Sequence, residues 1–191
     1  MSRQVFLFDP PERFVAGTVG QPGDRTFFLQ ATGSGRTVSV ALEKVQVAAL
    51  AERLEELLAE VRRRSASDPV APVATEPPSR ELEDTAPLDA PVEEEFRVGT
   101  LGLAWDGDGD RVVVEALAQQ EVDEQTPEVE PLSDAEEGPA ALRVRLPGSM
   151  ARAFVRRAQR VVAAGRPPCP LCGLPLDPEG HLCPRQNGHR R

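Results

Sequence analysis

Aromatic residues are scarce in this sequence. They make up 4% of it, with seven phenylalanines, one tryptophan and no tyrosine, so a hydrophobic core must consist mainly of leucine, valine and alanine. No apolar run reaches the roughly 18 residues that a membrane-spanning helix needs. The apolar stretch near the start is also too short for a signal peptide. These absences argue against a membrane partner and predict a cytoplasmic protein.

Cysteine and histidine are rarer still. The chain has three cysteines and two histidines, and all five lie between Cys169 and His189. Three cysteines, two of them in a Cys-x-x-Cys, fit a reducing compartment better than a disulfide framework. Because both histidines belong to this tail, no Ser-His or Cys-His pair remains for nucleophilic catalysis. We therefore expect a binding or adaptor protein rather than an enzyme.

Charge is distributed unevenly along the chain. Residues 65–95 and 121–139 each carry a net charge of −8, whereas residues 140–191 carry +8, within a total of −9. The first acidic segment is rich in proline and poor in apolar residues, which is typical of a disordered linker. The second lies between two expected strands and is interpreted as a long surface loop.

Two parts of the chain resemble each other. "FVAGTVG" at 14–20 matches "FRVGTLG" at 96–102, and "DRTFFLQA" at 24–31 matches "DRVVVEAL" at 110–117. Strand-like runs bounded by turn residues precede a helical pattern in both parts. The sequence therefore predicts an α+β fold with a duplicated β-β-β-α unit, antiparallel sheet or sheets and two main helices.

The expected organisation has four parts. They are a first repeat with an extra N-terminal strand at 1–64, an acidic Pro-rich linker at 65–94, a second repeat with an acidic loop at 120–140 inside 95–166, and a zinc knuckle at 167–191. The first helix is expected from about Glu43 to Arg64, on an apolar stripe that includes Leu50 and Leu54. The second should follow Ser149, a candidate N-cap.

Glycines and aspartates inside the strand patterns have structural interpretations. Gly17, Gly20, Gly99 and Gly102 indicate bulges or close backbone approaches, since no helix follows them as a phosphate loop requires. The aspartates at 106, 108 and 110 resemble the start of a calcium loop, but the required glutamate is absent at its twelfth position. A hairpin turn is the better interpretation.

The C-terminal tail has the ligand types of a structural zinc site. Cys169 and Cys172 form one pair on a tight turn, and the "DPEG" turn brings His181 and Cys183 back toward it. His189 is the alternative fourth ligand. Four protein ligands leave no open position for catalysis, and zinc would supply much of the folding energy of so short a segment.

Arginines on the second helix form a candidate surface for a partner. Arg152, Arg156 and Arg160 recur at four-residue spacing, with Arg157 beside them. We expect another protein as the partner. Nucleic acid is the alternative, because a basic helix beside a zinc module is a common nucleic-acid-binding arrangement. A metal-assisted hydrolase is a further alternative and requires a coordination position open to water.

Several stretches together resemble the actinobacterial domain-of-unknown-function 3090 family. They are "MSRQVFLFDPPERFVAGTVGQPGDRTFFLQA", "SVALEKVQVAALAERL", "FRVGTLGLAWD" and "CPLCGLPLDPEGHLCPRQNGHRR", and they cover most of the chain outside the acidic segments. The resemblance implies no particular activity. It does imply a Cys-x-x-Cys and Gly-His-x-Cys-Pro ending, which favours His181 over His189 as the fourth ligand.

Overall fold

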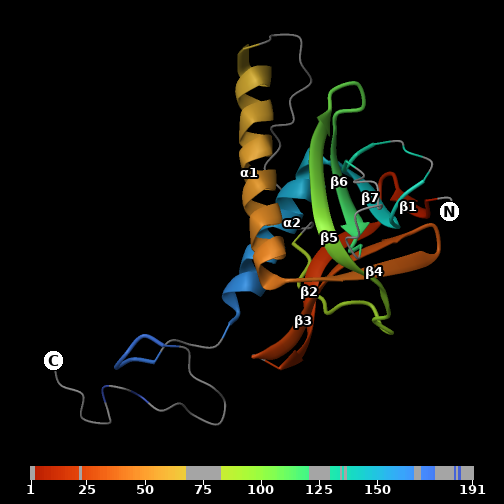
Figure 1. Ribbon diagram of the computed structural model, residues 1–191. Coiled ribbons are helices and arrows are strands. Elements are labelled where there is room, and N and C mark those ends of the chain that lie inside the picture. Colours follow the sequence, from red (N-terminus) through yellow and green to blue (C-terminus); the bar gives the residue numbers. More distant parts are fainter. Residues whose placement is uncertain are drawn as a thin grey trace.

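The fold consists of one sheet and two helices (Figure 1). The computed structural model describes residues 3–21, 23–67, 83–120, 130–133, 135, 137–165, 169–174, 183 and 185. The elements in chain order are β1 Val5–Phe8, β2 Arg13–Gln21, β3 Asp24–Gly33, β4 Arg36–Leu42, α1 Lys44–Ser67, β5 Glu94–Asp106, β6 Arg111–Ala118, β7 Ala141–Pro147 and α2 Gly148–Ala163.

All seven strands belong to a single mixed sheet. Their order is β1-β7-β6-β5-β4-β3-β2. The α+β class is confirmed, but the expectation of purely antiparallel pairing is wrong, because β1 pairs with β7 and β4 with β5 in parallel. The parallel pairing of β4 with β5 is possible because α1 carries the chain from the end of β4 back to the start of β5.

The order β-β-β-α occurs twice, as β2-β3-β4-α1 and as β5-β6-β7-α2. The strand registers differ between the two units. Gly20 pairs with Arg25 across the first hairpin, whereas its sequence match Gly102 pairs with Glu115. The second hairpin is therefore longer, and the two units do not superpose residue for residue.

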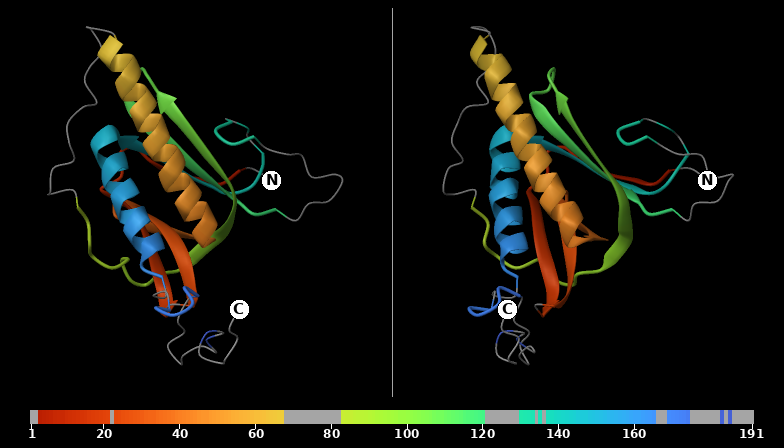
Figure 2. Two further views of the ribbon diagram at one scale, coloured as in Figure 1. Left: turned by 90° about the vertical axis from the view of Figure 1, so that its left-hand side faces the viewer. Right: turned by 60° about the vertical axis from the view of Figure 1, so that its left-hand side comes forward.

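Both helices cover the same face of the sheet and lie side by side (Figure 2). Helix α1 contacts β5 of the second unit, and α2 contacts β2 of the first as well as β6 and β7. One continuous core results, so residues 1–64 and 95–166 share it rather than forming separate domains. Among the described residues no helix is long and apolar enough to cross a membrane.

The helices begin and end differently from the sequence expectation. Helix α1 is three residues longer at its C-terminal end than the pattern predicts, and its stripe is buried at Val47, Leu50 and Leu54. Ser149 is not the N-cap of α2: Pro147 occupies that position, and no side chain caps the helix. At the C-terminal end of α2, Arg25 donates a hydrogen bond to the Ala164 carbonyl at 2.7 Å.

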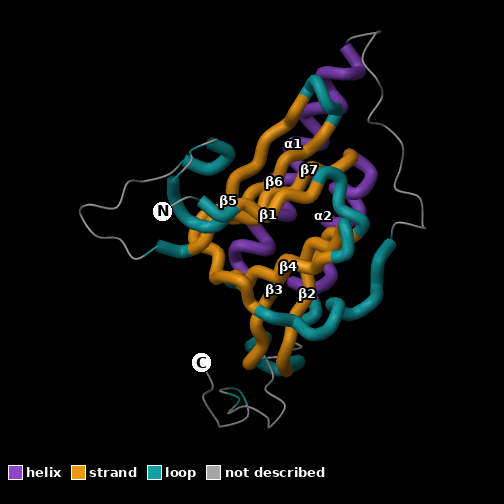
Figure 3. Tube along the Cα trace, turned by 90° about the vertical axis from the view of Figure 1, so that its right-hand side faces the viewer, coloured by secondary structure: helices purple, strands orange, loops and turns teal. Residues whose placement is uncertain are grey.

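Residues 83–93 are packed against the first unit, although their composition predicts disorder. They cross β2, β3 and β4 on the face opposite the helices (Figure 3). A Cβ atom at Gly17 would lie 2.6 Å from Leu88, so the predicted close approach at this glycine is confirmed. The buried Gln30 accepts a hydrogen bond from Asp89 N at 2.8 Å and donates to Asp89 O at 3.0 Å. The rest of the predicted linker, 68–82, lies outside the described residues.

The carboxylate of Asp84 connects the segment 83–93 to strand β2 and helix α2. It accepts hydrogen bonds from Arg13 Nε at 2.5 Å and from Arg157 Nη1 at 2.8 Å. Arg157 is only 7% exposed and also donates to Ala16 O at 2.7 Å, at the free edge of β2. Burial lowers the pKa of Arg157, and the Asp84 carboxylate opposes that effect. We call this set, Arg13, Asp84 and Arg157, the clasp.

A second buried charge lies on the same face of the second unit. Glu115 is 0% exposed and accepts hydrogen bonds from Arg3 Nη2 at 3.0 Å and Arg143 Nε at 2.9 Å. Leu132 N also donates to this carboxylate, which ties residues 130–133 to β6. The neighbouring Pro131 would lie 2.6 Å from a Cβ at Gly102. Each unit therefore has a loop packed on a strand glycine and held by buried polar groups.

The close backbone approaches predicted at Gly20 and Gly99 and the predicted hairpin turn after Asp106 are confirmed. Gly20 has φ of +101°, a conformation that side chains disfavour. Gly99 lies where the β5–β6 register shifts, and a Cβ there would be 2.9 Å from Gln119. Asp106 accepts backbone hydrogen bonds from Asp108 and Gly109, which closes a hairpin turn between β5 and β6.

Substitution of Asp84 tests the clasp. We expect Asp84→Asn to lower the free energy of unfolding by about 2–3 kcal/mol, because it leaves the buried Arg157 without its counter-charge. Urea denaturation measures the difference. Glu83→Gln is the matched control: its ion pair with Arg156 is exposed, and its loss should change the free energy by no more than about 0.5 kcal/mol. Equal effects of the two substitutions would contradict this role.

The pH dependence of stability provides a second test. The hydrogen bond from Arg13 lowers the pKa of Asp84, although desolvation opposes the shift. A lowered carboxyl pKa adds stability that is present above the ordinary value of about 3.9 and is lost as pH falls through the folded-state pKa. The difference in unfolding free energy between wild type and Asp84→Asn should therefore be constant near neutral pH and shrink below about pH 4. A difference independent of pH would argue against an ionised Asp84.

Candidate metal centre and helix cleft

The three cysteines meet at one point in the C-terminal tail. Their Sγ atoms all lie within 4.8 Å of one another, and the Cys169 and Cys183 sulfurs are 3.9 Å apart. Sulfurs at neighbouring corners of a tetrahedral zinc site are about 3.8 Å apart, as Zn–S bonds of about 2.3 Å require. All three thiols are free of disulfide bonds. The cysteine set therefore fits three corners of a tetrahedral metal site.

A tight backbone turn positions the first two thiols. Gly173 N donates to Cys169 O at 2.8 Å, and Cys169 N donates to Leu174 O at 2.7 Å. Gly173 closes the turn with φ of +76°, which the absence of a Cβ makes accessible. Cys169 and Cys183 are 6% and 4% exposed, and Cys172 is half-buried. The sequence Cys-x-x-Cys-Gly thus forms the turn that brings both thiols to one side.

The thiols ionise unequally in this turn. Burial raises the pKa of Cys169, but backbone N–H groups of Cys172 and Leu171 and the neighbouring thiols outweigh it, so the pKa falls below its ordinary value. The Leu174 N–H lowers the pKa of Cys172, whereas burial and the two other cysteines raise it more strongly, so its pKa is raised. A bound cation would remove this conflict, because a coordinated thiol is deprotonated.

The two histidines, His181 and His189, lie outside the described residues. The structure thus brings together three of the predicted metal ligands, Cys169, Cys172 and Cys183. The cluster can hold a metal ion, and its thiol-rich donor set suits zinc and other soft ions.

The predicted arginine row is divided among different environments. Arg152 and Arg156 line a cleft of about 300 Å³ between α1 and α2. Arg160 donates to Asp84 O at 3.3 Å, next to the clasp. Arg157, expected beside the outer row, is instead buried in the clasp, because it hydrogen-bonds the free edge of β2. The helix therefore exposes two arginines to the cleft rather than a continuous basic stripe.

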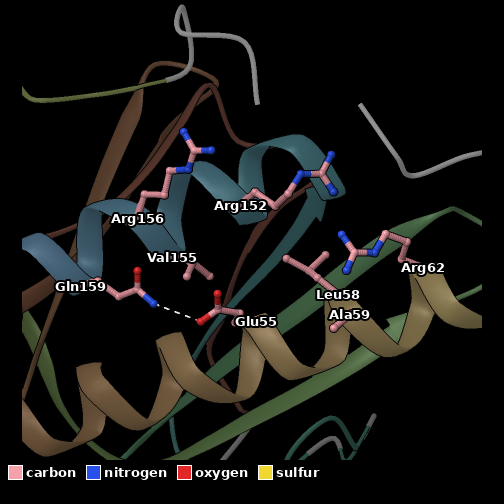
Figure 4. A pocket seen from close by; sticks show the side chains of 8 residues that line it. All are labelled: Glu55, Leu58, Ala59, Arg62, Arg152, Val155, Arg156 and Gln159. Atoms are coloured by element: carbon pink, nitrogen blue, oxygen red, sulfur yellow. Dashed lines mark hydrogen bonds between the residues drawn. The ribbon is translucent and has the colours of Figure 1, made fainter. Parts of the chain in front are cut away.

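The two helices contribute equally to the walls of this cleft (Figure 4). They run antiparallel here, since Gln159 Nε2 of α2 donates to Glu55 Oε2 of α1 at 3.1 Å while Arg62 and Arg152 lie at the opposite end. The floor consists of Leu58, Ala59 and Val155. Sequence reasoning missed the contribution of α1, because no local pattern shows which faces of two distant helices will meet.

The chain belongs to the family described as "Protein of unknown function (DUF3090)", whose match covers residues 6–183. The matched region includes both β-β-β-α units, the clasp and all three cysteines. Searches among curated proteins and solved structures found no match.

Replacing a cluster thiol should weaken metal binding. We expect Cys183→Ser to lower zinc affinity on the order of a hundredfold or more, since even groups that only orient metal ligands contribute 10–100-fold. Competition with a chromophoric chelator measures this affinity. Leu171→Ala is the control, because Leu171 lies on the same turn, is exposed and offers no ligand. An unchanged affinity in Cys183→Ser would show that the three thiols do not bind one ion.

Proposed function

We propose that this member of the DUF3090 family is a zinc-containing binding or adaptor protein in which the metal is structural. The observation that carries the proposal is the meeting of Cys169, Cys172 and Cys183 within 4.8 Å. Bound zinc supplies folding energy to the tail, and these residues hold it there. A reducing compartment such as the cytoplasm, where we place the protein, keeps all three thiols available.

The fourth ligand that we propose is His181, with His189 as the alternative. The family match includes His181 and stops before His189, which supports this choice. Three thiolates and one imidazole form a closed Cys3His set of the kind found in structural zinc sites. A metal-assisted hydrolase would need a position open to water, and this ligand set leaves none.

Two surface features support binding of another protein. Leu171 and Leu174 are about half-exposed on the metal-site turn, where a bound ion would hold them in place. The cleft between α1 and α2 is lined by apolar residues and by arginines. Apolar surface and arginine are both enriched in the centres of protein interfaces. Nucleic acid is the weaker alternative, because Arg157 is buried and Arg160 is hydrogen-bonded to the backbone carbonyl of Asp84.

We further infer that the two β-β-β-α units arose by duplication. The same element order and the repeated Phe-x-x-Gly-Thr-x-Gly stretch in β2 and β5 support this.

Metal analysis of the purified full chain tests the proposed function. We expect stoichiometric zinc, and we expect cobalt substitution to give the absorption spectrum of a tetrahedral thiolate site. His181→Ala should weaken binding and alter that spectrum, whereas the matched variant His189→Ala should do neither. Removal of zinc should leave the unfolding midpoint of the sheet and helices nearly unchanged.

Three outcomes would count against parts of this proposal. A zinc-free preparation whose tail is equally ordered after replacement of all three thiols by serine would refute the structural metal. A five-coordinate cobalt spectrum with exchangeable water would favour the hydrolase. The reverse behaviour of the two histidine variants would assign the fourth position to His189.

A further inference from the structure

The three cysteines of the tail differ in their exposure. Cys169 and Cys183 are 6% and 4% exposed, whereas Cys172 is half-buried. All three are free thiols, and their Sγ atoms lie within 4.8 Å of one another. Oxidation selects a thiol that the oxidant can reach, particularly where a second thiol lies close enough to complete a disulfide. Cys172 has both properties.

The backbone around the cluster favours Cys183 as the second thiol. Cys169 and Cys172 belong to one turn, which is closed by the hydrogen bonds from Gly173 N to Cys169 O and from Cys169 N to Leu174 O. Cys183 belongs to a stretch of chain outside these hydrogen bonds. Its sulfur can therefore approach that of Cys172, as a disulfide requires, while the turn stays closed.

We propose that the cysteine cluster is an oxidation-sensitive site, in which hydrogen peroxide converts Cys172 and Cys183 to a disulfide. This inference rests on the proposed structural zinc and names the regulation of that site. Of the proposed ligands, only Cys169 and His181 would remain after oxidation, whereas a structural zinc site uses four. The tail would therefore lose its metal and, with it, much of its folding energy.

The oxidation takes two steps, each of which balances. In the first, the Cys172 thiolate attacks one oxygen of the peroxide: the S–O bond forms, the O–O bond breaks, and the second oxygen leaves as hydroxide and takes up a proton. In the second, the Cys183 thiolate attacks the sulfur of the sulfenic acid: the S–S bond forms, the S–O bond breaks, and hydroxide again leaves as water. Two electrons pass from the sulfurs to the peroxide, and a dithiol reductant reverses the reaction.

The exposed leucines of the turn connect this chemistry to binding. Leu171 lies directly before Cys172, and Leu174 accepts the hydrogen bond that helps to close the turn. Both side chains are about half-exposed. A turn that has lost its metal would no longer hold them in fixed positions. The apolar surface that they form would therefore be present in reducing conditions and lost in oxidising ones.

The test titrates the full, zinc-loaded chain with hydrogen peroxide. We expect one equivalent of peroxide to release one equivalent of zinc to a chromophoric chelator, and the number of titratable thiols to fall from three to one. Proteolytic cleavage before Asp177 separates Cys183 from the other two cysteines, so fragment mass spectrometry should detect the Cys172–Cys183 link. NMR signals of Leu171 and Leu174 should lose dispersion, and dithiothreitol with zinc should restore them.

Two matched variants identify the first thiol to react. Cys169→Ser and Cys172→Ser each remove one ligand and keep Cys183, and both are measured in the same excess of zinc. Cys169→Ser should form the disulfide at close to the wild-type rate. Cys172→Ser should lose thiols about tenfold more slowly, because only the two buried thiols remain.

The proposal is overturned if excess peroxide leaves both the zinc and the three thiols in place, or if the two variants oxidise at equal rates. Oxidation of Cys172 to a sulfinic acid without a disulfide would also overturn it. Stoichiometric zinc that peroxide does not release rejects this inference alone. Absence of zinc from the reduced, purified chain rejects the proposed structural metal instead.

Discussion

The buried guanidinium of Arg157 is the interaction on which the arrangement of the two halves depends. It belongs to α2, yet it hydrogen-bonds the edge of β2 and the segment 83–93, so it connects parts of the chain that are distant in sequence. Direct strand pairing between the halves consists of two registered pairs of β4 with β5, around an irregularity, and four registered pairs of β1 with β7. The clasp and the common core therefore add to these strand pairs in holding the two halves together.

This arrangement also explains the candidate binding surface. Because α2 is pulled toward β2 and α1 extends toward β5, the two helices cross from one half to the other and meet as antiparallel neighbours. The cleft between them exists only when both halves are assembled. The cysteine cluster is different. A local turn holds Cys169 and Cys172, and Cys183 is its one thiol from outside that turn. The protein thus combines a surface made by the whole fold with a site made almost locally.

Features that depend on residues close together in the sequence are predicted correctly, whereas features that depend on distant segments are not. The two helices, the order of the strands, the strand glycines and the cysteine cluster follow from local spacing, and the structure agrees with them. Parallel pairing of β4 with β5 and of β1 with β7 depends on where distant segments meet, so the pattern could not indicate it. Residues 83–93 are ordered although their composition predicts disorder, because their hydrogen-bond partners, such as Arg13 and Gln30, lie elsewhere in the sequence. Arg157 is buried rather than exposed for the same reason, since helical spacing does not reveal the Ala16 carbonyl on the edge of a remote strand.

The position of β1 has a consequence for how the chain folds during its synthesis. This strand precedes the other six described strands in the sequence, yet its neighbour in the described sheet is β7, the last of them. Phe8 lies close to Gly33 and Arg36 of the first unit, but the strand that pairs with β1 is synthesised only with residues 141–147. The sheet is therefore completed by a contact of very high sequence separation, the kind that folds slowly.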